Sequence, residues 1–121
     1  MNEQEILEYF GKLLMKSARD QSIMELDWIL KGESKAPDHR ALQEELKNLS
    51  PENLALIRKL LIKAVDKTLH YVLSMIEQNQ RIDIVSYEKP GEVVSLRDAS
   101  DGLAGELYSG SGWIANFSAY K

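Results

Sequence analysis

The sequence of 121 residues contains no cysteine. This absence excludes a disulfide framework, a metal site built on thiolates and a cysteine nucleophile. The first residues, Met1–Glu5, are polar and acidic, without the basic and apolar stretches of a secretory signal. Both features fit a reducing compartment, so we expect a cytoplasmic protein.

Basic charge and long apolar runs are also scarce. Lysine and arginine number 15 against 19 aspartates and glutamates, which gives a net charge of −4. A nucleic-acid-binding surface needs concentrated basic charge, and we therefore expect no nucleic-acid partner. Apolar runs such as Leu60–Ile62 are far below the ~20 residues of a membrane-spanning helix, so we expect no membrane partner either.

Glycine is rare in the first part of the chain, and five of the seven glycines lie after residue 90. The apolar fraction of 44% and the charged fraction of 28% are typical of a globular chain. We predict a single domain over residues 1–121. Its helical part covers 1–80, and a small antiparallel sheet with a glycine-rich loop covers 81–121.

A long N-terminal helix is predicted by apolar residues at spacings of three and four. These residues are Ile6, Leu7, Phe10, Leu13 and Leu14. The helix runs to about Lys31, either continuously or with a kink near Asp20, and Gly32 ends it. Beyond Asp20 the apolar residues turn to a second side of the helix. A second copy of the chain could pack there, which makes a homodimer one candidate assembly.

Two further helices are predicted. A short one comes first, and a long one begins at Ser50 and Pro51, where a capping hydroxyl precedes a proline at the first helical position. It runs to about Gln78. Its polar residues fall within one arc of about 100°, and the rest is largely apolar. We therefore predict that this long hydrophobic helix is the central element of the core, and that a charge at Val65 or Ile76 unfolds the domain.

Two β-type runs follow, at 82–87 and 92–96, and a Pro-Gly pair lies between them. Runs of this kind joined by such a turn predict a β-hairpin. Alternating side chains at 113–118 predict a third short strand. The predicted fold class is α+β, in which the helical part packs with the C-terminal hairpin plus the third strand.

The first candidate site is a set of carboxylates and an imidazole on the long helix. Asp66, His70 and Glu77 share the polar arc, at spacings that suit a shared metal or a base with its orienting partner. Asp20 or Asp27 could complete such a site only through tertiary contacts. We favour the alternative, an ordinary solvated stripe, because a metal needs three or four ligands. Neither the His-Glu-x-x-His nor the Glu-x-x-His pattern is present.

The second candidate is the glycine-rich end. Its segment Gly110–Ala115 formally matches the dinucleotide-binding fingerprint, but too few residues follow for a βαβ unit of about 30 residues. Glycines at this density suit a shaped loop, and Leu103, Tyr108 and Trp113 are the residues that could meet a protein partner. We favour the alternative of a compact loop that covers the sheet, with Leu103, Leu107 and Trp113 as anchors.

No motif specifies a reaction, and we predict no catalytic residue and no cofactor. The expected function is that of a non-catalytic protein-binding or regulatory module, comparable in size and charge to small bacterial immunity proteins. The alternative is a small metal-binding protein or enzyme that uses Asp66, His70 and Glu77 with Asp20 or Asp27. Metal content, and the melting temperature with and without chelator, separate the two.

Overall fold

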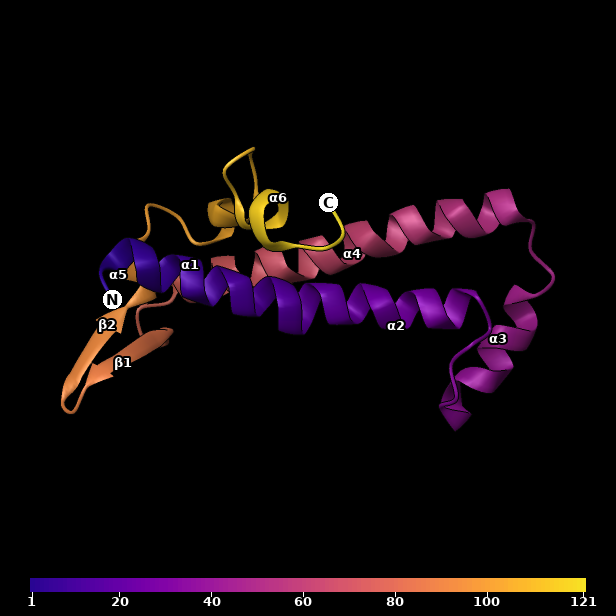
Figure 1. Ribbon diagram of the computed structural model, residues 1–121, viewed down its shortest axis with the longest axis horizontal. Helices are drawn as coiled ribbons and strands as arrows, with labels where there is room; N and C mark the ends of the chain where they lie inside the picture. Colours follow the sequence, from indigo (N-terminus) through magenta and orange to yellow (C-terminus); the bar gives the residue numbers. More distant parts are fainter.

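The computed structural model describes residues 1–121, and its first arm is one uninterrupted helix in three sections (Figure 1). The sections are α1 (Glu3–Leu14), a turn of π-helix named η1 (Met15–Asp20), and α2 (Gln21–Leu30). Of the two predicted forms the structure has the continuous one, and a π-helical turn lies where the kink was considered. At the start, Oδ1 of Asn2 accepts a hydrogen bond from the Glu5 amide at 2.8 Å. At the end, Gly32 adopts a positive φ of 73°, as glycine commonly does after a helix.

The second arm is α4 (Pro51–Gln78), which has the predicted bounds. Between the arms lie η2 (Pro37–His39) and α3 (Arg40–Leu46). The Ser50 hydroxyl accepts from the amide of Asn53 at 3.1 Å and so caps α4. α4 runs back beside α2 in the opposite direction, and the two arms form a long helical hairpin (Figure 1). None of the helices combines the length and the apolar character that crossing a bilayer requires.

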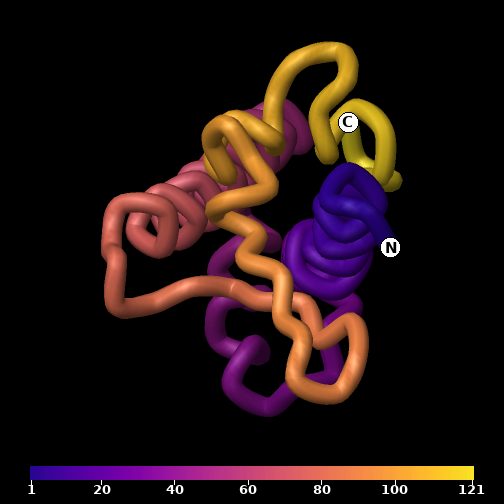
Figure 2. The backbone as a smooth tube through the Cα atoms, turned by 90° about the vertical axis from the view of Figure 1, so that its left-hand side faces the viewer, coloured from indigo at the N-terminus to yellow at the C-terminus, as the bar shows by residue number.

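The remaining elements are short. They are β1 (Val85–Lys89), β2 (Glu92–Ser95), α5 (Leu96–Ala99), η3 (Ala104–Leu107) and α6 (Trp113–Phe117). β1 and β2 pair antiparallel with Val85 opposite Ser95, and Gly91 in the turn has a φ of 81°. The predicted β-hairpin is therefore confirmed. Figure 2 shows α6 and the end of the chain, in yellow, lying over α1, in indigo.

The predicted third strand is wrong, because residues 113–118 contain α6 and the sheet has two strands. Alternating side chains suggested a strand, but Trp113 and Phe117 are also four residues apart, which places them on one side of a helix. Trp113 is buried against α1, where its ring meets that of Phe10 edge-on at a centroid distance of 5.6 Å. Packing of the indole on α1 therefore decides the local structure.

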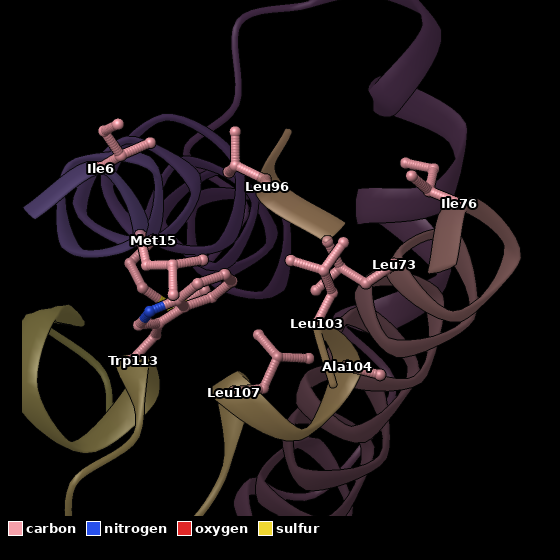
Figure 3. Packing of buried hydrophobic residues seen from close by; sticks show 10 residues of the cluster. Ile6, Met15, Leu73, Ile76, Leu96, Leu103, Ala104, Leu107 and Trp113 are labelled. Carbon is pink, nitrogen blue, oxygen red and sulfur yellow. The ribbon is translucent and has the colours of Figure 1, made fainter. Parts of the chain in front are cut away.

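The hydrophobic core lies at one end of the helical hairpin, where α1, η1, α5, η3, α6 and the last turns of α4 meet (Figure 3). Its buried residues are Ile6, Leu7, Met15, Leu73, Ile76, Leu96, Leu103, Ala104, Leu107 and Trp113. α4 contributes Leu73 and Ile76 and has no buried residue before them. The prediction that α4 is the centre of the core is not confirmed. Val65 is only half-buried, so a charge there is not expected to unfold the protein. That residues 1–121 form one domain stays a prediction.

Candidate functional site

α4 carries three neighbouring rows of side chains, each with a spacing of four residues. The inner row faces α2 and consists of Ile57, Leu61, Val65, Leu69 and Leu73, of which only the last is buried. The middle row consists of Leu56, Leu60, Ala64, Thr68 and Val72, all exposed. The outer row consists of Lys59, Lys63, Lys67, Tyr71 and Met75, also all exposed. One side of α4 is thus uncovered over most of its length.

The large apolar side chains of the middle and outer rows are open to solvent. Their exposed fractions range from 45% for Val72 to 69% for Leu60, with Leu56, Tyr71 and Met75 in between. Single exposed apolar residues are normal on protein surfaces, whereas a contiguous group marks an interaction site. All five side chains are exposed, so no other part of the chain covers this group.

A groove of about 290 Å³ runs beside these rows, between the first arm and α4. Its lining residues are Ala18, Ser22 and Leu26 on the first arm, and Leu61, Ala64, Val65, Thr68 and Leu69 on α4. The Thr68 hydroxyl donates to the carbonyl of Ala64 at 2.8 Å, so the backbone of α4 itself satisfies this polar group. The groove is therefore largely apolar and continuous with the middle row.

The outer edge of this surface is basic. Lys59, Lys63 and Lys67 are exposed and follow one another at intervals of four residues. None of them takes part in an ion pair, although other lysines and arginines of the chain do. In a protein with a net charge of −4, this row is a local concentration of unpaired positive charge.

Two of the three predicted partner-binding residues lie in the core. Leu103 and Trp113 are buried, so their side chains are not available to a partner. Tyr108 is 44% exposed, and its hydroxyl lies 3.1 Å from Nδ1 of His70. Burial, together with the nearby charges of Asp66 and Tyr71, raises the pKa of the Tyr108 phenol. The glycine-rich end therefore covers the core beside α1 and the last turns of α4, whereas the favoured alternative placed it over the sheet.

Four of the five residues of the predicted metal site are engaged elsewhere. Asp66 pairs with the buried Arg19, with Nε and Oδ1 2.6 Å apart. Asp20 accepts a hydrogen bond from the hydroxyl of Ser118. Asp27 pairs with Arg58, and Nε of Arg58 lies 2.7 Å from Oδ1 of Asp27. His70 contacts Tyr108. Glu77 lies next to Gly102, and its buried Oε1 has no hydrogen-bond partner. No three histidine or carboxylate side chains come together in a way that could hold a metal ion.

The surface on α4 was missed from the sequence, although the middle row is visible there as a spacing of four. Periodicity identifies an apolar side of a helix, but it does not tell whether the same chain covers that side. Comparison of the chain with protein-family models, curated proteins and solved structures finds no match. The chemistry of the surface itself is thus the guide to function.

Proposed function

We propose that this protein is a non-catalytic protein-binding module, of regulatory type, and that it binds through α4. The binding surface consists of the middle and outer rows and the adjoining groove. The observation that carries the proposal is the exposure of five large apolar side chains on α4, in one group at Leu56 and Leu60 and a second group at Tyr71, Val72 and Met75. A polar rim around an apolar patch is the usual arrangement of a protein interface.

The energy available from this surface suits reversible binding. Complete burial of a large apolar side chain contributes roughly 1.5 to 3 kcal/mol. The five exposed side chains are about half to two-thirds free, so a partner that covers them gains about 1 to 2 kcal/mol from each. Their combined contribution is of the order of the translational and rotational entropy lost on association. Contacts in the groove and at the lysines then supply net affinity.

Site-specific photo-crosslinking tests this function. A photoreactive amino acid in place of Leu60 should give discrete adducts with another protein in cells that produce the chain. The same amino acid in place of Glu44, which is exposed on α3, is the matched control and should give none. A second substitution, Leu56→Glu, should remove the adducts from position 60, because it places a charge in the apolar surface.

Two outcomes would contradict the proposal. The first is the absence of any protein adduct from position 60, and the second is an identical set of adducts from positions 60 and 44. Circular dichroism of each variant shows whether the helices are intact. Because Leu60 is exposed, its replacement should leave the fold unchanged.

A further inference from the structure

We infer that Ser34 is a nucleophile that takes up an acyl group from an activated ester or thioester, with His39 as its base. Ser34 lies in the loop after α2, and His39 is the last residue of η2. Neither residue belongs to the surface on α4, so the inference goes beyond the proposed binding function. It rests on the contacts of the serine hydroxyl, a nearby carboxylate, a buried clamp on the loop and an adjoining cavity.

The hydroxyl of Ser34 lies within hydrogen-bond distance of an imidazole. Its oxygen is 2.7 Å from Nδ1 of His39, and it also accepts from the amide of Ala36 at 3.4 Å. A serine hydroxyl is a weak nucleophile unless a neighbouring base removes its proton during the attack. An imidazole nitrogen at this distance is in the right position to do so.

Asp38 determines which nitrogen of the imidazole carries the proton. Oδ2 of Asp38 lies 3.9 Å from Nε2 of His39. A negative charge on that side of the ring favours the tautomer that has its proton on Nε2. Nδ1 then has a free lone pair and accepts from the hydroxyl of Ser34. The imidazole thus lies between nucleophile and carboxylate, as in a Ser-His-Asp triad, but with the two ring nitrogens exchanged.

The backbone at Ser34 is held by a buried glutamine of α3. Oε1 of Gln43 accepts from the amide of Ser34 at 2.8 Å, and Nε2 donates to the carbonyl of Ser34 at 3.2 Å. Gln43 is only 7% exposed. Two bonds to one residue limit the motion of the nucleophile relative to its base, so Gln43 is a positioning residue.

A cavity of about 330 Å³ adjoins the nucleophile. Its lining residues are Trp28, Glu33, Ser34 and Lys35. The indole of Trp28 is 43% exposed and offers apolar surface to an acyl or aryl group. The ammonium group of Lys35 can offset the negative charge that develops on the acyl oxygen. The volume is at the lower end of the range for small-molecule sites, which suits a small acyl donor.

The acyl transfer conserves atoms and charge. Oγ of Ser34 forms a bond to the acyl carbon while its proton passes to Nδ1 of His39. The bond between the acyl carbon and the oxygen or sulfur of the leaving group then breaks, and the imidazolium gives the proton to that atom. The products are a serine ester of the protein and a free alcohol, phenol or thiol.

Treatment of the intact protein with p-nitrophenyl acetate, followed by peptide mass spectrometry, tests the inference. Ser34 should be acetylated at least about tenfold faster than Ser17, an exposed serine that forms no hydrogen bond with a histidine. His39→Asn should abolish this preference. The matched control His70→Asn removes the other histidine of the chain and should keep it. Gln43→Ala measures the effect of a looser loop in which the base is still present.

Each outcome supports or overturns the inference. Equal rates at Ser34 and Ser17 in the wild type overturn the nucleophile. A preference that survives in His39→Asn overturns the base. Losses of equal size in His39→Asn and Gln43→Ala assign the effect to loop order and also overturn the base, whereas a larger loss in His39→Asn supports it. Protein adducts from position 60 depend on other residues, so failure of this test leaves the proposed function standing.

Discussion

Arg19, on the π-helical turn, donates two hydrogen bonds to the carboxylate of Asp66 in the middle of α4, at 2.6 and 3.3 Å. The same guanidinium donates to the hydroxyl of Ser118 at 2.7 Å and to the carbonyl of Tyr120. Arg19 is only 2% exposed. A single buried cation, which does not belong to the hydrophobic core, thus joins the first arm, the second arm and the end of the chain.

Replacing Arg19 by methionine should lower the free energy of unfolding by about 3 kcal/mol, because the change leaves the Asp66 carboxylate without its partner and removes one donor each from Ser118 and Tyr120. Urea unfolding followed by circular dichroism measures the loss. Arg40→Met is the control, since Arg40 is exposed on α3 and forms no ion pair. A loss below about 0.5 kcal/mol would show that the buried pair contributes little to stability.

A pair of leucines on α4 should respond in opposite ways to truncation. Leu73 is 2% exposed and belongs to the core, so Leu73→Ala should cost about 3 kcal/mol. Leu60 is 69% exposed, and Leu60→Ala should change stability by less than about 0.5 kcal/mol. Chemical denaturation of the two variants checks the contrast. If both variants lost the same free energy of unfolding, the middle row would have to be covered in solution.

Local signals allowed the ends of the helices to be predicted. Ser50 with Pro51, and Gly32, act through the backbone of their own segment, so the sequence contains the whole cause. The hairpin turn at Gly91 is likewise determined by the backbone of its own segment. The misplaced strand at 113–118 and the misjudged centre of the core depend on distant partners: Trp113 packs on α1, and the core forms where the last turns of α4 meet α5 and η3.

The candidate site was harder to predict for the same reason. The polar arc of Asp66, His70 and Glu77 is real, but Arg19 is 47 positions away from Asp66 and no pattern in the sequence connects them. The apolar content of α4 predicted burial on several sides. The short elements after residue 80 cover only its last turns, which leaves Leu56 and Leu60 exposed.

Gly11 should not tolerate a side chain. A Cβ atom at this position would lie 2.5 Å from atoms of the buried Trp113 indole. Gly11→Ala should therefore destabilise the protein by about 2 kcal/mol through overpacking, despite the better helix propensity of alanine. Thermal unfolding measures the change. In Gly105→Ala the added Cβ meets no atom within 4 Å, and this control should unfold near the wild-type temperature.

Tyr108 should ionise at a higher pH in the folded protein than in the unfolded chain. Burial and the charges of Asp66 and Tyr71 raise the pKa of its phenol above the ordinary value of 10.0. The folded protein holds the phenol proton more tightly than the unfolded chain does, and this difference stabilises the fold. The stabilisation is complete below pH 10 and is lost as the pH rises through the raised pKa of the folded protein. The absorbance difference between wild type and Tyr108→Phe, titrated with and without urea, isolates this group. A folded pKa equal to the value in urea would contradict the expectation.

The end of the chain should loosen when Ser118 loses its hydroxyl. Ser118 is buried, accepts from Arg19 at 2.7 Å and donates to Oδ1 of Asp20 at 2.5 Å, while the Ala119 amide donates to Oδ2 of Asp20 at 3.0 Å. Ser118→Ala removes one hydrogen-bond partner each from the charged groups of Arg19 and Asp20 and should cost about 1 to 3 kcal/mol.

Hydrogen exchange measures the effect locally, because the amide of Ala119 should exchange at least about tenfold faster in this variant if its bond to Asp20 weakens by 1.4 kcal/mol or more. The amide of Lys31, which donates to the Asp27 carbonyl at the far end of α2, should keep its wild-type rate. If both amides accelerate equally, the variant has lost global stability and the end of the chain is not a separate unit. If neither changes, the carboxylate of Asp20 holds the chain end without the serine.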